Sequence, residues 1–133
     1  MRKELEQRII NRWPAWFDVE GNICATLMPR GFQHGDGWFD LVWKMCEDLE
    51  PLVPGREATS AAPFQVFEVK EKFGSLRVYV GRANKAIQRR IEEAGSESKR
   101  TCEICGKAGF QRNNGGWINT RCYDHAPSGQ IEV

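Results

Sequence analysis

Hydrophobic residues recur at helical spacing in three stretches of the chain. In residues 3–13 an apolar residue returns at every fourth position, and Pro14 ends the run. In residues 37–50 one continuous apolar face is preceded by Asp36, a plausible N-cap, and is followed by Pro51. Residues 83–98 carry a third such face, with Gly95 weakening its end. We therefore expect three helices.

The second of these helices has two apolar stripes. The main face holds Trp38, Leu41, Val42, Met45 and Leu49. A second stripe is formed by Phe39, Trp43 and Cys46. A helix that is apolar on two sides is expected to be buried on both.

Alternating apolar and polar residues indicate strands elsewhere. Residues 64–81 alternate on both sides of Lys72-Phe73-Gly74-Ser75, which predicts a β-hairpin with its turn at that sequence. Residues 14–37 are irregular, and weak strands are expected around residues 22–28. Residues 51–63 are typical of a turn-rich connector.

Residues 102–125 have the spacing of a zinc site. Cys102 and Cys105 form a C-x2-C pair, and after sixteen intervening residues Cys122 and His125 form a C-x2-H pair. Zn²⁺ takes four such ligands in a tetrahedron, and four protein ligands leave no open position for catalysis. Gly106 permits the tight backbone after the second ligand. We expect one structural Zn²⁺ per chain.

Between the two ligand pairs, Asn113-Asn114-Gly115-Gly116 is a strong turn signal, and the strand-like residues 117–120 follow it. The whole pattern predicts an α+β protein. Residues 1–98 would form a helix and β-hairpin body, and residues 99–133 a zinc-ribbon (zinc-knuckle) element packed with it as one compact unit.

Other candidate chemistry is weaker. Cys24 or Cys46 could be paired with His34 as a thiol nucleophile and its base. Cys46 lies on an apolar stripe and Cys24 in an apolar setting, so we expect both to be buried, and His34 to be a surface histidine. The sequence has no P-loop, no dinucleotide-binding glycine motif and no nucleophile-elbow serine.

An HNH-type nuclease would need a further catalytic histidine and a helix after the second ligand pair. Only eight residues follow His125 in this sequence, and they include Pro127 and Gly129. We therefore expect no catalytic residues and a protein that is not an enzyme.

Composition narrows the class further. The 133 residues are 41% hydrophobic and 28% charged, which fits one globular domain, and the net charge is only +1. No apolar run is long enough for a membrane span, and the N-terminal residues lack the apolar segment of a secretory signal. We expect a cytoplasmic protein that does not bind membranes, in a compartment where clustered cysteines favour metal over disulfides.

Basic residues near the zinc ligands raise a second possibility. Lys107, Arg112 and Arg121, with Trp117 and Tyr123 nearby, could contact phosphates and stack on bases. Acidic residues interrupt this set, so a mixed solvated surface is the favoured interpretation.

Three segments in a fixed order resemble one group of proteins. They are GDGWFDLVWKMCEDLE (35–50), EVKEKFGSLRVYV (68–80) and CEICGKAGFQRNNGGWINTRCYDHA (102–126). Together they resemble a widespread group of small uncharacterised proteins encoded by bacteriophages and prophages. The resemblance implies a phage or prophage origin, a bacterial host cell and a zinc ribbon. It brings no established activity and no catalytic residues.

Two functions from different classes stay open. The favoured one is a non-enzymatic accessory protein that binds a host or phage protein, for instance to modulate a bacterial defence system. The alternative is a nucleic-acid-binding zinc module that uses Lys107, Arg112 and Arg121. The oligomeric state and the roles of residues 1–34 and of His34 are left open by the sequence.

Overall fold

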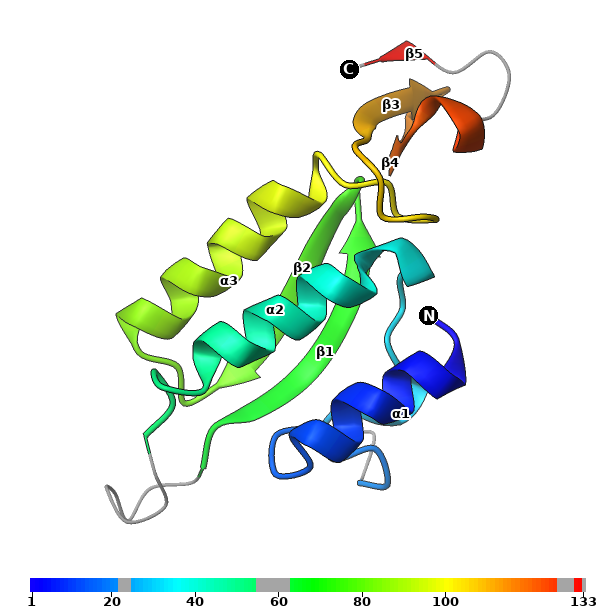
Figure 1. Ribbon diagram of the computed structural model, residues 1–133. Coiled ribbons are helices and arrows are strands. Elements are labelled where there is room, and N and C mark those ends of the chain that lie inside the picture. Colours follow the sequence, from blue (N-terminus) through cyan, green and yellow to red (C-terminus); the bar gives the residue numbers. More distant parts are fainter. Residues whose placement is uncertain (22–24, 55–62, 127–130, 133) are drawn as a thin grey trace.

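The computed structural model describes residues 1–21, 25–54, 63–126 and 131–132, and its fold is α+β, as predicted (Figure 1). In chain order the helices and strands are α1 (Lys3–Arg12), α2 (Phe39–Leu49), β1 (Gln65–Lys72), β2 (Ser75–Gly81), α3 (Lys85–Ser98), β3 (Phe110–Asn114), β4 (Trp117–Arg121) and β5 (Ile131–Glu132). Short 3-10 turns are η1 (Met28–Arg30), η2 (Asp36–Trp38) and η4 (Tyr123–His125).

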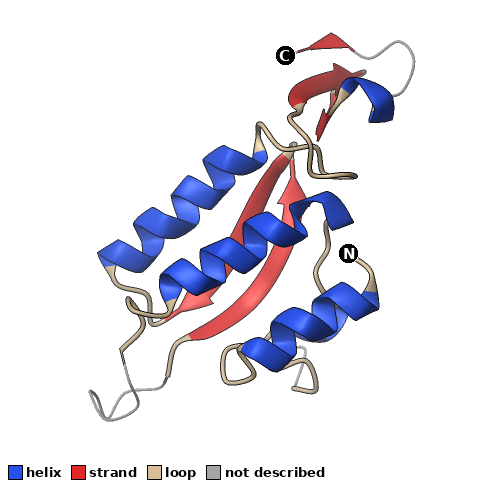
Figure 2. Cartoon of the chain, in the orientation of Figure 1, coloured by secondary structure: helices blue, strands red, loops and turns tan. Residues whose placement is uncertain are grey.

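The body is built around the β1–β2 hairpin. Helices α2 and α3 run side by side over one face of this hairpin (Figure 2). The sheet of β3, β4 and β5, in the order β4-β3-β5, lies beyond the turn of the hairpin. The fold therefore separates a helix-covered hairpin from a small C-terminal sheet.

The two predicted stripes extend over the end of η2 and along α2, and all their residues are buried except Trp43, which is half-buried. Trp38, Leu41, Val42, Met45 and Leu49 are all buried, and so are Phe39 and Cys46 of the second stripe. The predicted cap at Asp36 is wrong. Asp36 lies inside η2 and accepts a hydrogen bond from the Arg2 backbone N–H at 2.8 Å, because the chain enters α2 through a 3-10 turn.

The β1–β2 hairpin has the predicted turn. Phe73 and Gly74 connect the strands with φ angles of 54° and 77°, the combination of a type I′ turn. Helix α3 follows, and it begins where the Asn84 side chain accepts a hydrogen bond from the Ile87 N–H. The helix ends at Ser98, as predicted, and Gly95 lies inside its last turn.

The segment between α1 and α2 contains less strand than predicted. Residues 22–24 lie outside the described residues, residues 25–27 form no strand, and Met28 already belongs to η1. Instead, isolated bridges pair Phe17 with Val66 and Gln33 with Lys70 of β1. The described residues of this segment therefore lie along β1 through isolated bridges and form no third strand.

The C-terminal sheet also follows its turn signal. Strands β3 and β4 are joined by Gly115 and Gly116, both at positive φ. Strand β5 pairs with β3 and was not predicted. Within the described residues, no helix combines the length and apolar character needed to cross a bilayer.

Candidate metal centre

The first pair, Cys102 and Cys105, lies on a tight turn shortly after α3, residues 102–107, which we call the knuckle. The Cys102 N–H donates to Lys107 O at 2.7 Å, and the Gly106 N–H donates to Cys102 O at 2.9 Å. Gly106 has a φ of 82°, a left-handed conformation that a glycine adopts without strain. The role predicted for Gly106 is thus confirmed.

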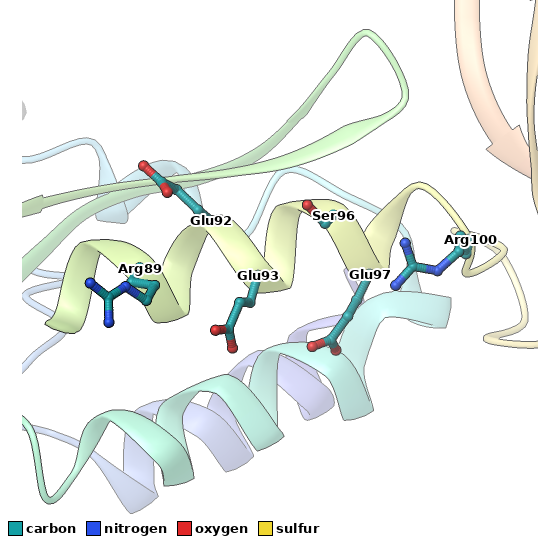
Figure 3. A pocket seen from close by; sticks show the side chains of 6 residues that line it. All are labelled: Arg89, Glu92, Glu93, Ser96, Glu97 and Arg100. Atoms are coloured by element: carbon teal, nitrogen blue, oxygen red, sulfur yellow. The ribbon is translucent and has the colours of Figure 1, made fainter. Parts of the chain in front are cut away.

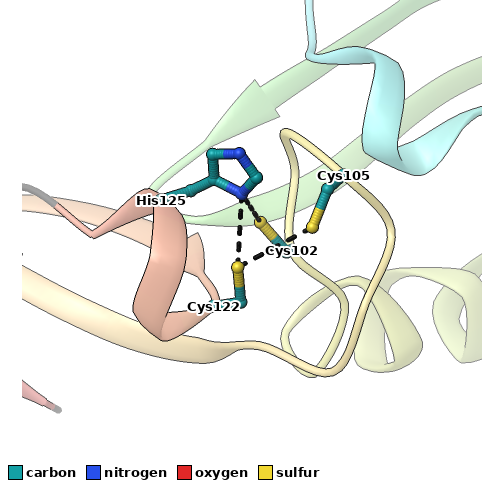
Figure 4. Close-up of side chains that lie close together, drawn as sticks. All are labelled: Cys102, Cys105, Cys122 and His125. Atoms are coloured by element: carbon teal, nitrogen blue, oxygen red, sulfur yellow. Dashed lines mark hydrogen bonds between the residues drawn. The ribbon is translucent and has the colours of Figure 1, made fainter.

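The second pair lies on η4, just after β4. The His125 N–H donates to Cys122 O at 3.2 Å, which turns the imidazole back toward the thiols. Figure 4 shows the four side chains converging from the knuckle and from η4. Two segments distant in sequence are therefore brought together by the β3–β4 hairpin.

The four ligand atoms form one cluster. Cys105 Sγ lies 3.7 Å from Cys122 Sγ, and His125 Nδ1 lies 3.2 Å from Cys122 Sγ and 3.8 Å from Cys102 Sγ. All four ligand atoms are within 4.8 Å of one another. Cys102, Cys105, Cys122 and His125 could bind a metal ion, with Nδ1 as the imidazole ligand.

Backbone N–H groups favour a thiolate at the buried end of this cluster. Burial opposes ionisation of Cys102, but N–H groups of Cys122, Cys105 and Ile104 outweigh it and lower the pKa of its thiol to about 6. At the exposed Cys105 the Lys107 N–H favours the thiolate, yet desolvation and the neighbouring thiols raise its pKa. Deprotonated thiols are the form that binds metal, so Cys102 is prepared for a cation.

The knuckle is bonded to the body at η2. The Gly37 N–H donates to Glu103 O at 2.7 Å, and the Trp38 indole N–H donates to Thr101 O at 2.8 Å. The Gly35 N–H donates to the Glu103 carboxylate at 2.8 Å. Burial raises the pKa of this Glu103 carboxyl, while the bond from Gly35 acts in the opposite direction.

Sequence reasoning missed this attachment. A Cβ on Gly37 would lie 2.2 Å from Cys102 O, so only glycine permits the approach. The Gly-Asp-Gly-Trp sequence by itself indicates only the start of a helix. The available signal was Gly37 before a buried tryptophan, which suggests a close backbone approach but does not indicate which segment approaches.

Cys46 does not belong to the cluster. Cys46 is buried in α2 as predicted, and burial raises the pKa of its thiol. Cys24 lies outside the described residues.

The prediction that His34 is a surface histidine is wrong. Its side chain is only 6% exposed and lies near the rings of Phe32 and Trp38. The ring is buried because the residues that lead into η2 fold inward. Its Nδ1 lies 2.8 Å from Gly35 O. Burial lowers the pKa of His34 to about 4, so the ring is neutral at pH 7.

The three basic residues considered for phosphate binding differ in exposure. Lys107 is exposed. Arg121 is half-buried and donates to His125 O at 3.3 Å. Arg112 is buried, donates to Arg121 O, and places its guanidinium 5.0 Å from the Tyr123 ring centre.

A shallow hollow of about 380 Å³ lies on α3. Figure 3 shows that its lining comes from α3 and the residues just after it: Arg89, Glu92, Glu93, Ser96, Glu97 and Arg100. Small-molecule sites usually have apolar walls with a few polar groups. This lining, which carries charges of both signs and no large apolar side chain, does not fit such a site.

Comparisons with protein-family models, with curated proteins and with solved structures gave no match to this chain. Its function is therefore inferred from the residues and their geometry.

Proposed function

We propose that Cys102, Cys105, Cys122 and His125 hold one structural Zn²⁺ and make residues 99–126 a zinc ribbon. The observation that carries this proposal is the convergence of three thiols and one imidazole nitrogen within 4.8 Å. Tetrahedral Zn²⁺ with Zn–S bonds of about 2.3 Å separates two sulfurs by roughly 3.8 Å. The 3.7 Å between Cys105 and Cys122 is close to that value.

Metal analysis of the purified protein tests the zinc proposal. One Zn²⁺ per chain is expected for the wild type and for Cys46→Ala, whose thiol lies in the core of the body. Cys105→Ala should lose the ion or bind it weakly. A metal content near zero in wild-type protein prepared under reducing, zinc-replete conditions would contradict the proposal.

We propose further that the chain is a non-enzymatic binding protein and that its ligand is another protein. Four protein ligands around the ion leave no open coordination position, which supports a structural role. The proposed contact surface is the aromatic face, which we define as Phe110, Trp117 and Tyr123. Their side chains are 42%, 71% and 72% exposed.

The strand register places two of these rings on one face, at opposite ends of the β3–β4 hairpin. Phe110 pairs with Arg121 and Asn114 with Trp117, so Phe110 and Trp117 lie on the same face of the β3–β4 hairpin. Tyr123 packs on Phe110 with ring centres 5.4 Å apart. Thr120, on the opposite face, donates to Gly74 O at 2.6 Å and so faces the body. The aromatic face is thus directed away from the body.

Exposed aromatic rings favour a protein partner over nucleic acid here because few cations accompany them. Arg112 is buried under the rings and Arg121 is bonded to His125 O, which leaves Lys107 as the exposed cation of the three. Aromatic anchors dominate many protein interfaces, whereas nucleic-acid binding depends on several phosphate contacts. The resemblance to phage proteins makes a host or phage protein, including a defence component, the first class to test.

Affinity capture from bacterial lysate, with and without nuclease, tests this proposal. A captured protein should survive nuclease and be lost with Trp117→Ala/Tyr123→Ala. The matched control is Phe73→Ala, which removes an aromatic ring that is 60% exposed at the other hairpin. A Lys107→Ala/Arg121→Ala variant should retain capture. If nuclease releases the partner and this variant loses it, the nucleic-acid function replaces the proposed one.

A further inference from the structure

The two edges of the β1–β2 sheet differ. The outer edge of β1 is occupied by the segment before α2. The Leu27 N–H donates to Phe67 O at 2.8 Å. The backbone N–H of Gln33 donates to Val69 O at 2.9 Å, and the Gln33 carbonyl accepts from the Glu71 N–H at 2.9 Å. With the bond from the Val66 N–H to Trp16 O, four backbone groups along this edge have partners in that segment and in the residues after α1.

The outer edge of β2 is open. Lys72 and Ser75 flank a two-residue turn and therefore form a hydrogen-bonded pair. From this pair onward, non-hydrogen-bonded and hydrogen-bonded pairs alternate along the antiparallel ladder. Arg77 and Tyr79 therefore bond to β1, while Val78 and Val80 direct their N–H and C=O groups outward. Ser98 Oγ accepts from the Leu76 N–H at 2.8 Å. No hydrogen bond joins the outward groups of Val78 or Val80 to any described part of the chain.

A groove follows this open edge. It has a volume of about 280 Å³ and lies between β2 and α3. Val78 and Ile91 are half-buried and give it an apolar floor. Gly95 contributes no side chain to the lining, and a Cβ there would lie 3.4 Å from Leu76 O. An extended backbone could thus lie beside β2 with one set of side chains toward this floor.

The rim of the groove is mainly basic. Arg77 and Lys99 are both exposed, and neither has an ion pair with a described residue. Arg77 also lies opposite Lys70 in the strand register, where like charges repel. Glu92 is the one carboxylate of the lining. A carboxylate on an incoming strand would relieve this repulsion.

We propose that the β2 edge binds an extended acidic peptide segment of a partner protein as an added strand. Main-chain hydrogen bonds to Val78 and Val80 supply the pairing. Alternate apolar side chains contact Val78 and Ile91, and acidic side chains lie beside Arg77 and Lys99. A second copy of the chain is disfavoured because edge pairing would bring two such basic rims together. This binding site is independent of the aromatic face and of the metal.

A display library of random seven-residue peptides, selected on the intact zinc-loaded protein, provides the probe. We expect the selected peptides to alternate Val or Ile with Asp or Glu. N-methylation of the best peptide at alternate residues should abolish binding for one set of positions and spare the other set, because only one set of N–H groups faces β2. Equal tolerance of N-methylation at every position would overturn the proposal.

Two protein variants complete the test. Val78→Pro removes an outward N–H without removing a β1–β2 hydrogen bond and should weaken peptide binding at least tenfold. Arg77→Glu should also weaken the binding of acidic peptides at least tenfold, and this variant introduces no proline into the strand. Arg89→Glu, a matched charge reversal outside this groove, should leave peptide binding unchanged. Retained binding in Arg77→Glu overturns the proposal.

Two further controls distinguish peptide binding at the β2 edge from binding at the aromatic face and from self-association. Trp117→Ala should leave peptide binding unchanged, which distinguishes failure of this inference from failure of the proposed function. Sedimentation of the free protein tests for self-association. A dimer that Val78→Pro converts to monomer would assign the edge to a second copy and overturn the peptide proposal.

Discussion

The body and the C-terminal element are stabilised by different means. In the body, buried apolar side chains extend from Ile9 to Ala94 and form one continuous core. Among the described residues from 99 onward, the buried hydrophobic side chains are those of Cys102 and Cys122, and the other buried side chains are polar. A segment without an apolar core needs another source of folding free energy, and the proposed metal would supply it.

Removing the metal should have the largest effect, and it should be confined to one region. Structural zinc contributes roughly 10–16 kcal/mol of apparent binding free energy in zinc-finger peptides. We expect a chelator, or Cys122→Ala, to abolish hydrogen-exchange protection of residues 102–126 while α2 and β1–β2 keep theirs. Mass-spectrometric exchange measures both regions at once. Unchanged protection in residues 102–126 after metal loss would contradict this comparison.

Local sequence patterns predicted features of both regions. Local periodicity was sufficient for α1, α2, α3 and the β1–β2 hairpin, because each depends on neighbouring residues. The Cys/His cluster was readable from the paired spacings for the same reason. These are features that a short window of sequence encodes.

The contact between the regions was not predictable in this way. Gly35 and Glu103 are 68 positions apart, and nothing in either local sequence names the other. The burial of His34 has the same origin, because its loop is drawn inward by contacts at η2. Asp36 was predicted as a cap for a helix that in fact begins after a 3-10 turn.

The attachment at η2 can be broken by one methyl group. In Gly37→Ala the new Cβ meets backbone atoms of Cys102 at 2.2 Å and of Gly106 at 2.6 Å, and neither atom can rotate away. We expect a loss of about 3–4 kcal/mol in the free energy of unfolding, which is large for one substitution. Urea denaturation measures it.

The matched control is Gly95→Ala in α3. Its Cβ reaches only ordinary contact at 3.4 Å, and alanine favours a helix over glycine by about 1 kcal/mol. A neutral or slightly stabilising result is expected. If the two alanine variants had the same free energy of unfolding, the backbone of the knuckle would not be in close contact with Gly37.

The body should also carry a pH response of its own. The pKa of His34 is about 4 in the folded state, below its ordinary value of 6.5. The unfolded chain therefore binds the proton more strongly, so stability falls as pH drops from about 6.5 toward 4. Between pH 7 and pH 5 the loss is about 2 kcal/mol.

His34→Phe separates this response from acid loss of the metal. Phenylalanine keeps an aromatic ring near Phe32 and Trp38 but cannot be protonated. Denaturation of both proteins at pH 7 and pH 5 should show a smaller decrease in the variant. Parallel pH dependence would mean that His34 is not held neutral by burial.

A substitution in the β1–β2 turn should have the smallest effect on stability, and the β3–β4 turn shows why. Gly115 and Gly116 adopt positive φ without strain, whereas Phe73 adopts φ of 54° with a bulky side chain that is 60% exposed. Because asparagine tolerates this conformation better and little packing is lost, Phe73→Asn should stabilise the protein by about 0.5–1 kcal/mol. The thermal unfolding midpoint should rise accordingly. Gly74→Ala, at φ of 77° and 3.1 Å from the backbone of Asn119, should instead lower it. A lower midpoint for Phe73→Asn would show that the exposed ring stabilises the turn.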